Sequence, residues 1–168
     1  AEKNAEKGRV DLHIHTRFSD GAFTVDQILD MAEENGVKAL SITDHDTMEA
    51  YPYVKEEGAK RGMEVIPGAE LSCELDGHDI HILGYFLDYT NKPLLDALEI
   101  MRDARFHRAK KMVDNLNNQG VDLRFETVLR FAGEGAIGRP HIATALLHEE
   151  LVYSFRDKIS WIKFILLY

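Results

Sequence analysis

Six histidine and carboxylate side chains in the first half of the sequence are of the types that bind metal ions. They begin with a His-x-His pair and continue at wider intervals: His13, His15, Asp20, His45, Glu70 and His81. A His-x-His pair alone is often an accident of packing, but the histidines and carboxylates that follow this pair favour a metal site. Imidazole mixed with carboxylate suits zinc, manganese or iron, and one glutamate can bridge two ions. Because Cys73 is the only cysteine, a thiolate-based site is excluded.

The elements that would position these side chains alternate between strands and helices. We expect strands over 9–15, 37–42, 63–72 and 79–86, and helices over 25–35 and between Pro52 and Gly62. The order strand, helix, strand, helix, strand indicates parallel βα units in an α/β fold. The carboxyl ends of parallel strands gather at one face, so the six side chains should converge there.

The pattern changes after residue 91. A long amphipathic helix is predicted over residues 92–118, and further helices are predicted near 125–132 and 139–149. The sequence contains no internal repeat and no low-complexity linker. This second part is therefore expected to be helical.

The composition is that of an acidic globular protein. The chain has 168 residues, 45% of them hydrophobic, and a net charge of −9. Such a charge repels polyanions and disfavours general coating of nucleic acid, although bound cations would reverse the local field for a phosphate. The longest apolar stretch, WIKFILLY, is too short to span a bilayer, and the first residues are polar. We therefore expect a cytoplasmic protein with no membrane partner.

Four segments resemble, in order and spacing, the first motifs of the PHP (polymerase and histidinol phosphatase) family: DLHIHTRFSDG, SITDHDT, IPGAELS and DIHILGY. The resemblance is greatest to its bacterial branch of nucleoside 3',5'-bisphosphate phosphatases and 5'-to-3' exoribonucleases. It implies a distorted (β/α)7 barrel with a trinuclear metal centre. Residues 9–91 would form the N-terminal part of this barrel, and residues 92–150 would form a helical insertion.

The resemblance also assigns roles to the six side chains. His13 and His15 would bind a first ion, and Asp20 and His45 would bind a second. Glu70 would bridge to a third ion that His81 also binds. Two or three divalent ions, manganese, zinc or iron, are thus the expected cofactors, and Glu70 and His45 are the residues expected to act in catalysis.

Residues of the helical part would bind the phosphate of the substrate. By the resemblance these are Arg105 or Arg108 on the long helix, and His141 in the segment GRPHIATAL. The alternative for the arginines is a solvated helix face, because Arg102, Arg105 and Arg108 recur at helical spacing. His141 could equally be a structural or an exposed residue.

The remaining polar residues near the motifs have less defined roles. Asp44 and Asp46 could orient His45 from a second layer, although Asp46 could instead cap a helix. Three histidines match no ligand position and are interpreted as incidental: His78, His107 and His148.

The sequence departs from the family in its last part. The family supplies further ligands from later strands, in a His-Pro segment and an Asp-x-His pair. No His-Pro dipeptide occurs in the chain, and no Asp-x-His pair follows residue 150. Residues 151–168 form an atypical, apolar tail, which a truncated, frameshifted or split gene could produce. Uncovered barrel edges would then favour self-association.

These observations support one leading hypothesis and two alternatives. The leading hypothesis is a metal-dependent phosphoester hydrolase whose metal-activated water attacks a phosphate of a nucleotide or short oligonucleotide. One alternative is a noncatalytic metal-binding module, because expected ligands are absent. The other is a phosphatase of small molecules such as histidinol phosphate.

Overall fold

The computed structural model describes residues 8–152 and confirms the α/β class. The strands are β1 (Arg9–Ile14), β2 (Val37–Ile42), β3 (Glu64–Val65), β4 (Gly68–Leu75) and β5 (His78–Tyr85). The helices are α1 (Val25–Glu34), α2 (Tyr51–Lys60), α3 (Lys92–Asn118), α4 (Phe125–Ala132) and α5 (Arg139–His148). Residues 153–168, most of the expected atypical tail, lie outside the described residues.

The strands form two separate sheets. Strands β1, β2 and β3 pair in parallel in that order, which confirms the predicted βα units. Strands β4 and β5 form an antiparallel hairpin with pairs running from Gly68 with Tyr85 to Leu75 with His78. The hairpin meets the first sheet at a short parallel contact between His45 and Glu70.

The prediction of a single strand over 63–72 was wrong. This segment holds β3 and β4, which belong to different sheets. Pro67 lies between them and has no backbone N–H to donate to a neighbouring strand, so pairing stops there. The chain then turns into the hairpin, which carries Glu70 and His81 on facing strands.

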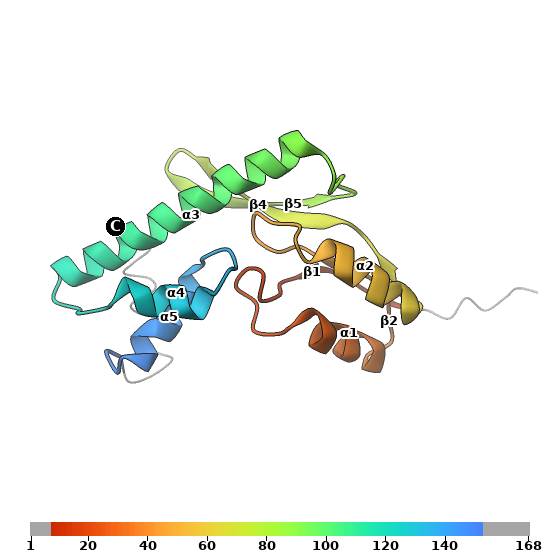
Figure 1. Cartoon of the computed structure of the whole chain (residues 1–168), viewed down its shortest axis with the longest axis horizontal. Helices are drawn as coiled ribbons and strands as arrows, with labels where there is room; N and C mark the ends of the chain where they lie inside the picture. Colours follow the sequence, from red (N-terminus) through yellow and green to blue (C-terminus); the bar gives the residue numbers. More distant parts are fainter. Residues whose placement is uncertain (1–7, 153–168) are drawn as a thin grey trace, which may run out of the picture.

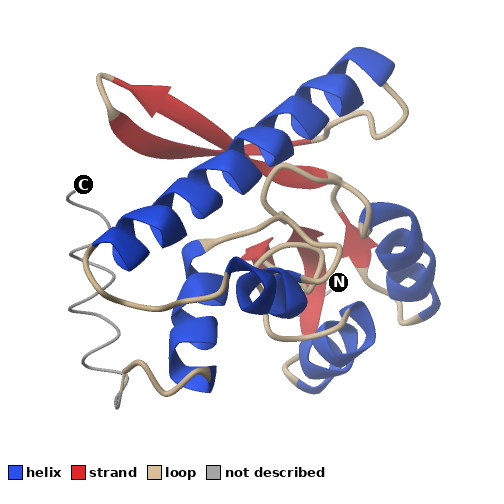
Figure 2. Ribbon diagram, turned by 60° about the vertical axis from the view of Figure 1, so that its left-hand side comes forward, coloured by secondary structure: helices blue, strands red, loops and turns tan. Residues whose placement is uncertain are grey.

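Each helix covers a particular part of this frame. Figure 1 shows α1 and α2 beside the parallel sheet, and α4 packed with α5 at the other end of the molecule. In Figure 2, α3 crosses the hairpin of β4 and β5. None of the helices among residues 8–152 is long and apolar enough to cross a membrane.

Three groups of buried hydrophobic side chains hold these layers together. The first lies between α1, α2 and the parallel sheet and includes Leu29, Leu40 and Val54. The second joins α3, α4 and α5 and includes Val113, Leu123, Val128, Ile142 and Leu146. A smaller group of Met48, Ala69 and Leu98 packs α3 onto β4. Removal of this apolar area from water is the main force that fixes the helices on the sheets.

The helix starts follow local signals in the sequence. The predicted capping box of α1 is present, because Thr24 accepts from the backbone of Gln27 and Gln27 accepts in return. Pro52 lies in the first turn of α2, as expected. Helix α3 begins after Asn91, whose side chain accepts a hydrogen bond from the backbone N–H of Leu94.

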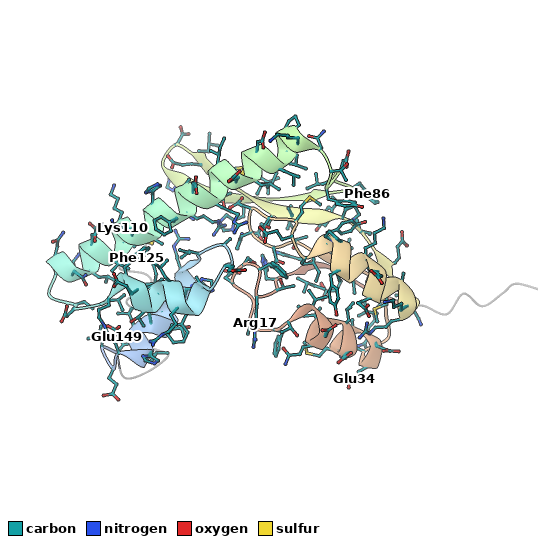
Figure 3. All side chains as sticks on the ribbon, in the orientation of Figure 1. Arg17, Glu34, Phe86, Lys110, Phe125 and Glu149 are labelled. Carbon is teal, nitrogen blue, oxygen red and sulfur yellow. The ribbon has the colours of Figure 1, made fainter. Side chains whose placement is uncertain are left out.

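Glu149 joins the end of α5 to the start of α4 (Figure 3). Its carboxylate accepts hydrogen bonds from the Thr127 hydroxyl and from the backbone N and Nε of Arg124. Burial opposes ionisation of Glu149, but these hydrogen bonds lower its pKa. The stabilisation is therefore present above the pKa of the unfolded chain, about 4.5, and is lost as the pH falls through the lower folded value.

We expect Glu149→Gln to lower the free energy of unfolding by about 1 kcal/mol at pH 7, because it weakens charge-assisted hydrogen bonds. The difference from the wild type should shrink as the pH falls below about 4.5. Thermal unfolding at a series of pH values measures it. Glu150→Gln removes the same charge one residue later and serves as the control. A difference that is constant from pH 7 to pH 3 would contradict the assignment.

Candidate metal centre

The structure brings the six predicted side chains together at the junction of the two sheets. Together these six side chains form what we call the metal-type cluster. Their donor atoms fall into three overlapping metal-type groups, with the atoms of each group within 4.8 Å of one another. The groups are His13, His15 and Glu70; His15, Asp20 and His45; and His45, Glu70 and His81. The expected convergence is therefore confirmed, although its frame is a parallel sheet plus a hairpin.

The carboxylate of Glu70 lies at the centre of the cluster. Its Oε2 atom is 2.7 Å from Nε2 of His13 and 2.9 Å from Nε2 of His15, and its Oε1 atom is 2.8 Å from Nδ1 of His81. The Glu70 side chain is only 7% exposed. One buried carboxylate thus contacts imidazoles from β1, from the loop that follows it, and from β5.

Asp20 approaches the cluster from the loop after β1. Its Oδ1 atom is 3.6 Å from Nδ1 of His15, and its Oδ2 atom is 3.6 Å from Nε2 of His45. These separations are too long for hydrogen bonds. Two ligands each about 2.1 Å from one ion at a tetrahedral angle lie about 3.4 Å apart, so the spacing suits ligands that share an ion.

Two further observations test whether these residues fit metal ions. Nδ1 of His45 is buried without a hydrogen-bond partner in the described structure, which is unusual for a ring nitrogen. The Nε2 atoms of His13 and His15 are 3.1 Å apart, and both face Glu70. One cation between His13, His15 and Glu70, and another between His45, Glu70 and His81, would give each of these nitrogens a partner, so the donor set fits.

The charge states of the donors also suit metal binding. Burial, together with the nearby Arg105, lowers the pKa of His45 to about 4, so its imidazole is neutral at pH 7. Burial opposes ionisation of Glu70, but the hydrogen bond with His13 and the charges of the neighbouring histidines lower its pKa. A neutral imidazole and an ionised carboxylate are the forms that bind metal.

The buried carboxylate of Asp44 fixes the loop that carries Asp20. It accepts hydrogen bonds from the backbone N and the hydroxyl of Thr16, at 2.7 and 2.6 Å, and from the hydroxyl of Ser19 at 2.6 Å. Burial raises the pKa of Asp44, although these hydrogen bonds oppose the rise. Asp44 thus orders the loop beside His45; no hydrogen bond between the two side chains is present.

Asp46 has a corresponding role on the hairpin side. It accepts from the backbone N and hydroxyl of Ser72, at 2.7 and 2.5 Å, and from Nε of Arg105 at 2.5 Å. The alternative in which Asp46 caps a helix was wrong, because the residue before α2 is Ala50 and no side chain caps that helix. Asp46 is fully buried, and its carboxylate accepts hydrogen bonds from β4 and α3 instead.

A cavity of about 190 Å³ opens beside the cluster. Its polar lining consists of three of the six clustered side chains and three arginines: Asp20, His45, His81, Arg105, Arg108 and Arg139. Arg105 is buried, so the alternative of a solvated helix face does not apply to it. Nη2 of Arg105 and Nε of Arg139 are buried without hydrogen-bond partners among the described residues. Such donors beside a metal-type cluster suit an anion.

Arg139 is the member of this cavity that sequence reasoning missed. It lies in the first turn of α5, in the segment GRPHIATAL, one residue before Pro140. The signal was the position of this segment at a helix start, where backbone N–H groups and a cation favour an anion. His141, two residues later, was the residue of this segment expected to bind phosphate.

His141 lines a different cavity. This neighbouring cavity of about 440 Å³ shares Asp20 and Pro140 with the first. Arg17, labelled in Figure 3, also lines this second cavity. The ring Nδ1 of His141 accepts a hydrogen bond from the backbone N of Gly138 at 3.0 Å. Burial lowers its pKa, so the ring is neutral at pH 7 and leaves an N–H at Nε2.

The three histidines interpreted as incidental lie outside the metal-type groups. His78, His107 and His148 belong to none of the three groups of donors. His107 and His148 instead contact the rings of Phe106 and Phe131.

Comparison with known proteins identifies the family of the chain. The family model of the PHP domain matches residues 11–162, and the chain therefore belongs to the PHP family. The chain is 36% identical over 139 residues to a 5'-3' exoribonuclease, Rnm, of Salmonella typhimurium, covering 82% of this chain and 47% of that protein. It is 31% identical over 148 residues to a 3',5'-nucleoside bisphosphate phosphatase of Chromobacterium violaceum, covering 88% and 52%.

A solved structure shows the same likeness. An amidohydrolase from Chromobacterium violaceum, with bound sulfate and no metal, superposes with a TM-score of 0.81 at 30% sequence identity. The match covers 90% of this chain and 54% of the other. The chain thus spans about half the length of the curated relatives and of the solved structure that it matches.

Because Glu70 belongs to two of the three groups, we expect Glu70→Gln to lose more bound manganese than His81→Ala. Gln keeps the shape of the side chain but not its charge, and it cannot balance two like-charged ions. Elemental analysis after dialysis gives the ions held per chain, with His78→Ala, on the same strand as His81, as the control. Equal losses in Glu70→Gln and His81→Ala would contradict a bridging role.

Proposed function

We propose that this chain binds two or three divalent ions and a phosphate group, and acts in hydrolysis of phosphoesters of nucleotides or short oligonucleotides. The observation that carries the proposal is that three side chains of the metal-type cluster also line the arginine cavity. Asp20, His45 and His81 belong to the metal-type groups and also line the arginine cavity. A phosphate in that cavity would lie against both the cations of the cluster and the guanidinium groups.

The donor set selects the class of ion. Four imidazoles and two carboxylates favour manganese, zinc or iron over magnesium and calcium, which prefer oxygen ligands. His15, His45 and Glu70 each occur in two groups, and of these three only the Glu70 carboxylate has a second oxygen with which it can bridge two ions. Divalent ions bound there would supply positive charge for the phosphate oxygens and a water of lowered pKa as the nucleophile.

The protein's own side chains would hold the substrate in place. Arg105, fixed by Asp46 and Ser72, keeps Nη2 free to donate to a phosphate oxygen. Arg108 and Arg139 approach the same cavity from two different helices. Guanidinium groups donate two parallel hydrogen bonds to a phosphate, which fixes its orientation as well as its position. Glu70 and His45 would act through the ions that they hold.

The relatives support nucleotide substrates. Two of them are named for hydrolysis of RNA from its 5' end and of nucleoside bisphosphates. The related solved structure holds sulfate, an anion of the same shape as phosphate. We further propose that residues 9–91 form the N-terminal part of a distorted barrel and residues 92–150 a helical insertion. The separate hydrophobic core of α3, α4 and α5 agrees with such a division.

A second candidate is a noncatalytic metal-binding module. It would apply if the six clustered side chains were the only protein ligands of the ions. Ions with fewer ligands would bind less tightly, since loss of even an outer partner costs roughly 10- to 100-fold in affinity or activity. Under this candidate the cluster still binds metal ions, but the chain does not catalyse hydrolysis.

Phosphate release separates the two candidates. With manganese in excess, we expect these 168 residues to hydrolyse adenosine 3',5'-bisphosphate slowly, and His15→Ala or a chelator to abolish the reaction. Arg108→Ala should raise KM about tenfold, the effect of losing one charge-assisted contact. Lys110→Ala, an exposed cation of the same helix outside the cavity, is the matched control.

Release should be followed with the bisphosphate, with a phosphomonoester and with a short 5'-phosphorylated RNA. Tight manganese binding without release from any of the three would favour the noncatalytic module. Release that survives His15→Ala would show that the activity does not come from this cluster.

A further inference from the structure

Asp79 occupies an unusual position beside the arginine cavity. It lies on β5 two residues before His81, so the two side chains leave the same face of the strand. Its Oδ1 accepts from Nη1 of Arg108 at 2.8 Å, and its Oδ2 accepts from Nη2 of Arg139. One carboxylate therefore joins the hairpin to α3 and to the first turn of α5.

The two arginines need such a partner to stay in place. Both are long side chains on separate helices, and two like charges facing one cavity repel each other. Their side chains are only 31% and 26% exposed, and that of Asp79 is 28% exposed, so solvent screens the contacts incompletely. A carboxylate that takes one guanidinium on each oxygen fixes both at once.

The pairing leaves donors for a substrate. Each guanidinium has five N–H groups, and Asp79 accepts from one nitrogen of each arginine. Nε of Arg139 remains buried without a partner among the described residues. Both arginines line the cavity that also contains Asp20, His45 and His81. The unused donors can therefore face an anion that lies against the metal-type cluster.

We propose that Asp79 is a positioning residue for phosphate binding, which holds Arg108 and Arg139 as a fixed pair on the wall of the cavity. The inference rests on the proposed function and deepens it by naming what arranges the phosphate site. It goes against simple electrostatics, because a carboxylate next to an anion site repels the anion. The two effects of Asp79 have opposite signs, and this makes the proposal testable.

The test uses Asp79→Asn in the intact 168-residue chain with manganese bound. Removal of the negative charge alone would tighten binding of inorganic phosphate. We expect the opposite, about tenfold weaker binding by calorimetry, because the pair of arginines is released. KM for adenosine 3',5'-bisphosphate should rise by a similar factor with little change in kcat, as expected when binding to ground and transition states is lost equally.

Three comparisons separate positioning from a general structural effect. Asp76→Asn removes the same charge from the exposed turn of the same hairpin, where the structure gives the Asp76 side chain no hydrogen bond among the described residues, and should leave phosphate binding unchanged. Asp79→Glu keeps the charge and should retain more phosphate binding than Asp79→Asn. Manganese content should be the same in Asp79→Asn and the wild type.

The outcomes also distinguish this inference from the proposed function. If the wild type binds phosphate and Asp79→Asn binds it equally or more tightly, Asp79 does not position the arginines. Lost manganese or a lowered unfolding midpoint in both Asp79→Asn and Asp79→Glu would likewise overturn the positioning role in favour of a structural one. If the wild type with bound manganese does not bind phosphate, the proposed phosphate site is itself wrong.

Discussion

The short parallel contact between the loop after β2 and strand β4 is the constraint on which the rest of the site depends. The backbone N of Glu70 donates to the carbonyl of Asp44 at 3.2 Å, and the backbone N of Asp46 donates to the carbonyl of Glu70 at 3.0 Å. These two hydrogen bonds join the hairpin to the parallel sheet. Without them Glu70 would not lie among the histidines of β1 and its following loop, and the three groups of donors would not overlap.

The two aspartates on either side of His45 extend this constraint into the surroundings. Asp44 orders the loop of Thr16 and Ser19, and Asp46 orders Ser72 and Arg105. Both carboxylates are almost fully buried, where each must be satisfied by donors to remain there. The segment from Asp44 to Asp46 thus orders the loop that carries Asp20 and also holds Arg105 at the cavity. This explains how an acidic protein can hold a buried guanidinium group beside the cluster.

Much of the fold and of the candidate site could be predicted because its signals are local. The alternation in residues 9–15, the capping box at Thr24 and the chemical types of the six donors are properties of short segments. The rule that parallel strands share their carboxyl ends predicted the convergence of the donors, and it applies to His15, Asp20 and His45, which follow β1 and β2. It does not apply to Glu70 and His81, which reach the cluster from the antiparallel hairpin. The division of residues 63–72 into two strands was not predicted, because the hydrophobic pattern continues through Pro67 and the partner of each half lies elsewhere in the sequence.

The sequence by itself determined which residues can bind metal, which segments form helices, and the family to which the motifs point. Only the tertiary structure decided which arginines line the cavity beside the cluster and which carboxylates of the protein pair with them. The three arginines of the cavity lie on two helices, and their carboxylate partners, Asp46 and Asp79, lie 29 or more positions away in the sequence. Such contacts depend on how α3 and α5 pack over the hairpin, and helical periodicity fixes the spacing within a helix but not the neighbour that it meets.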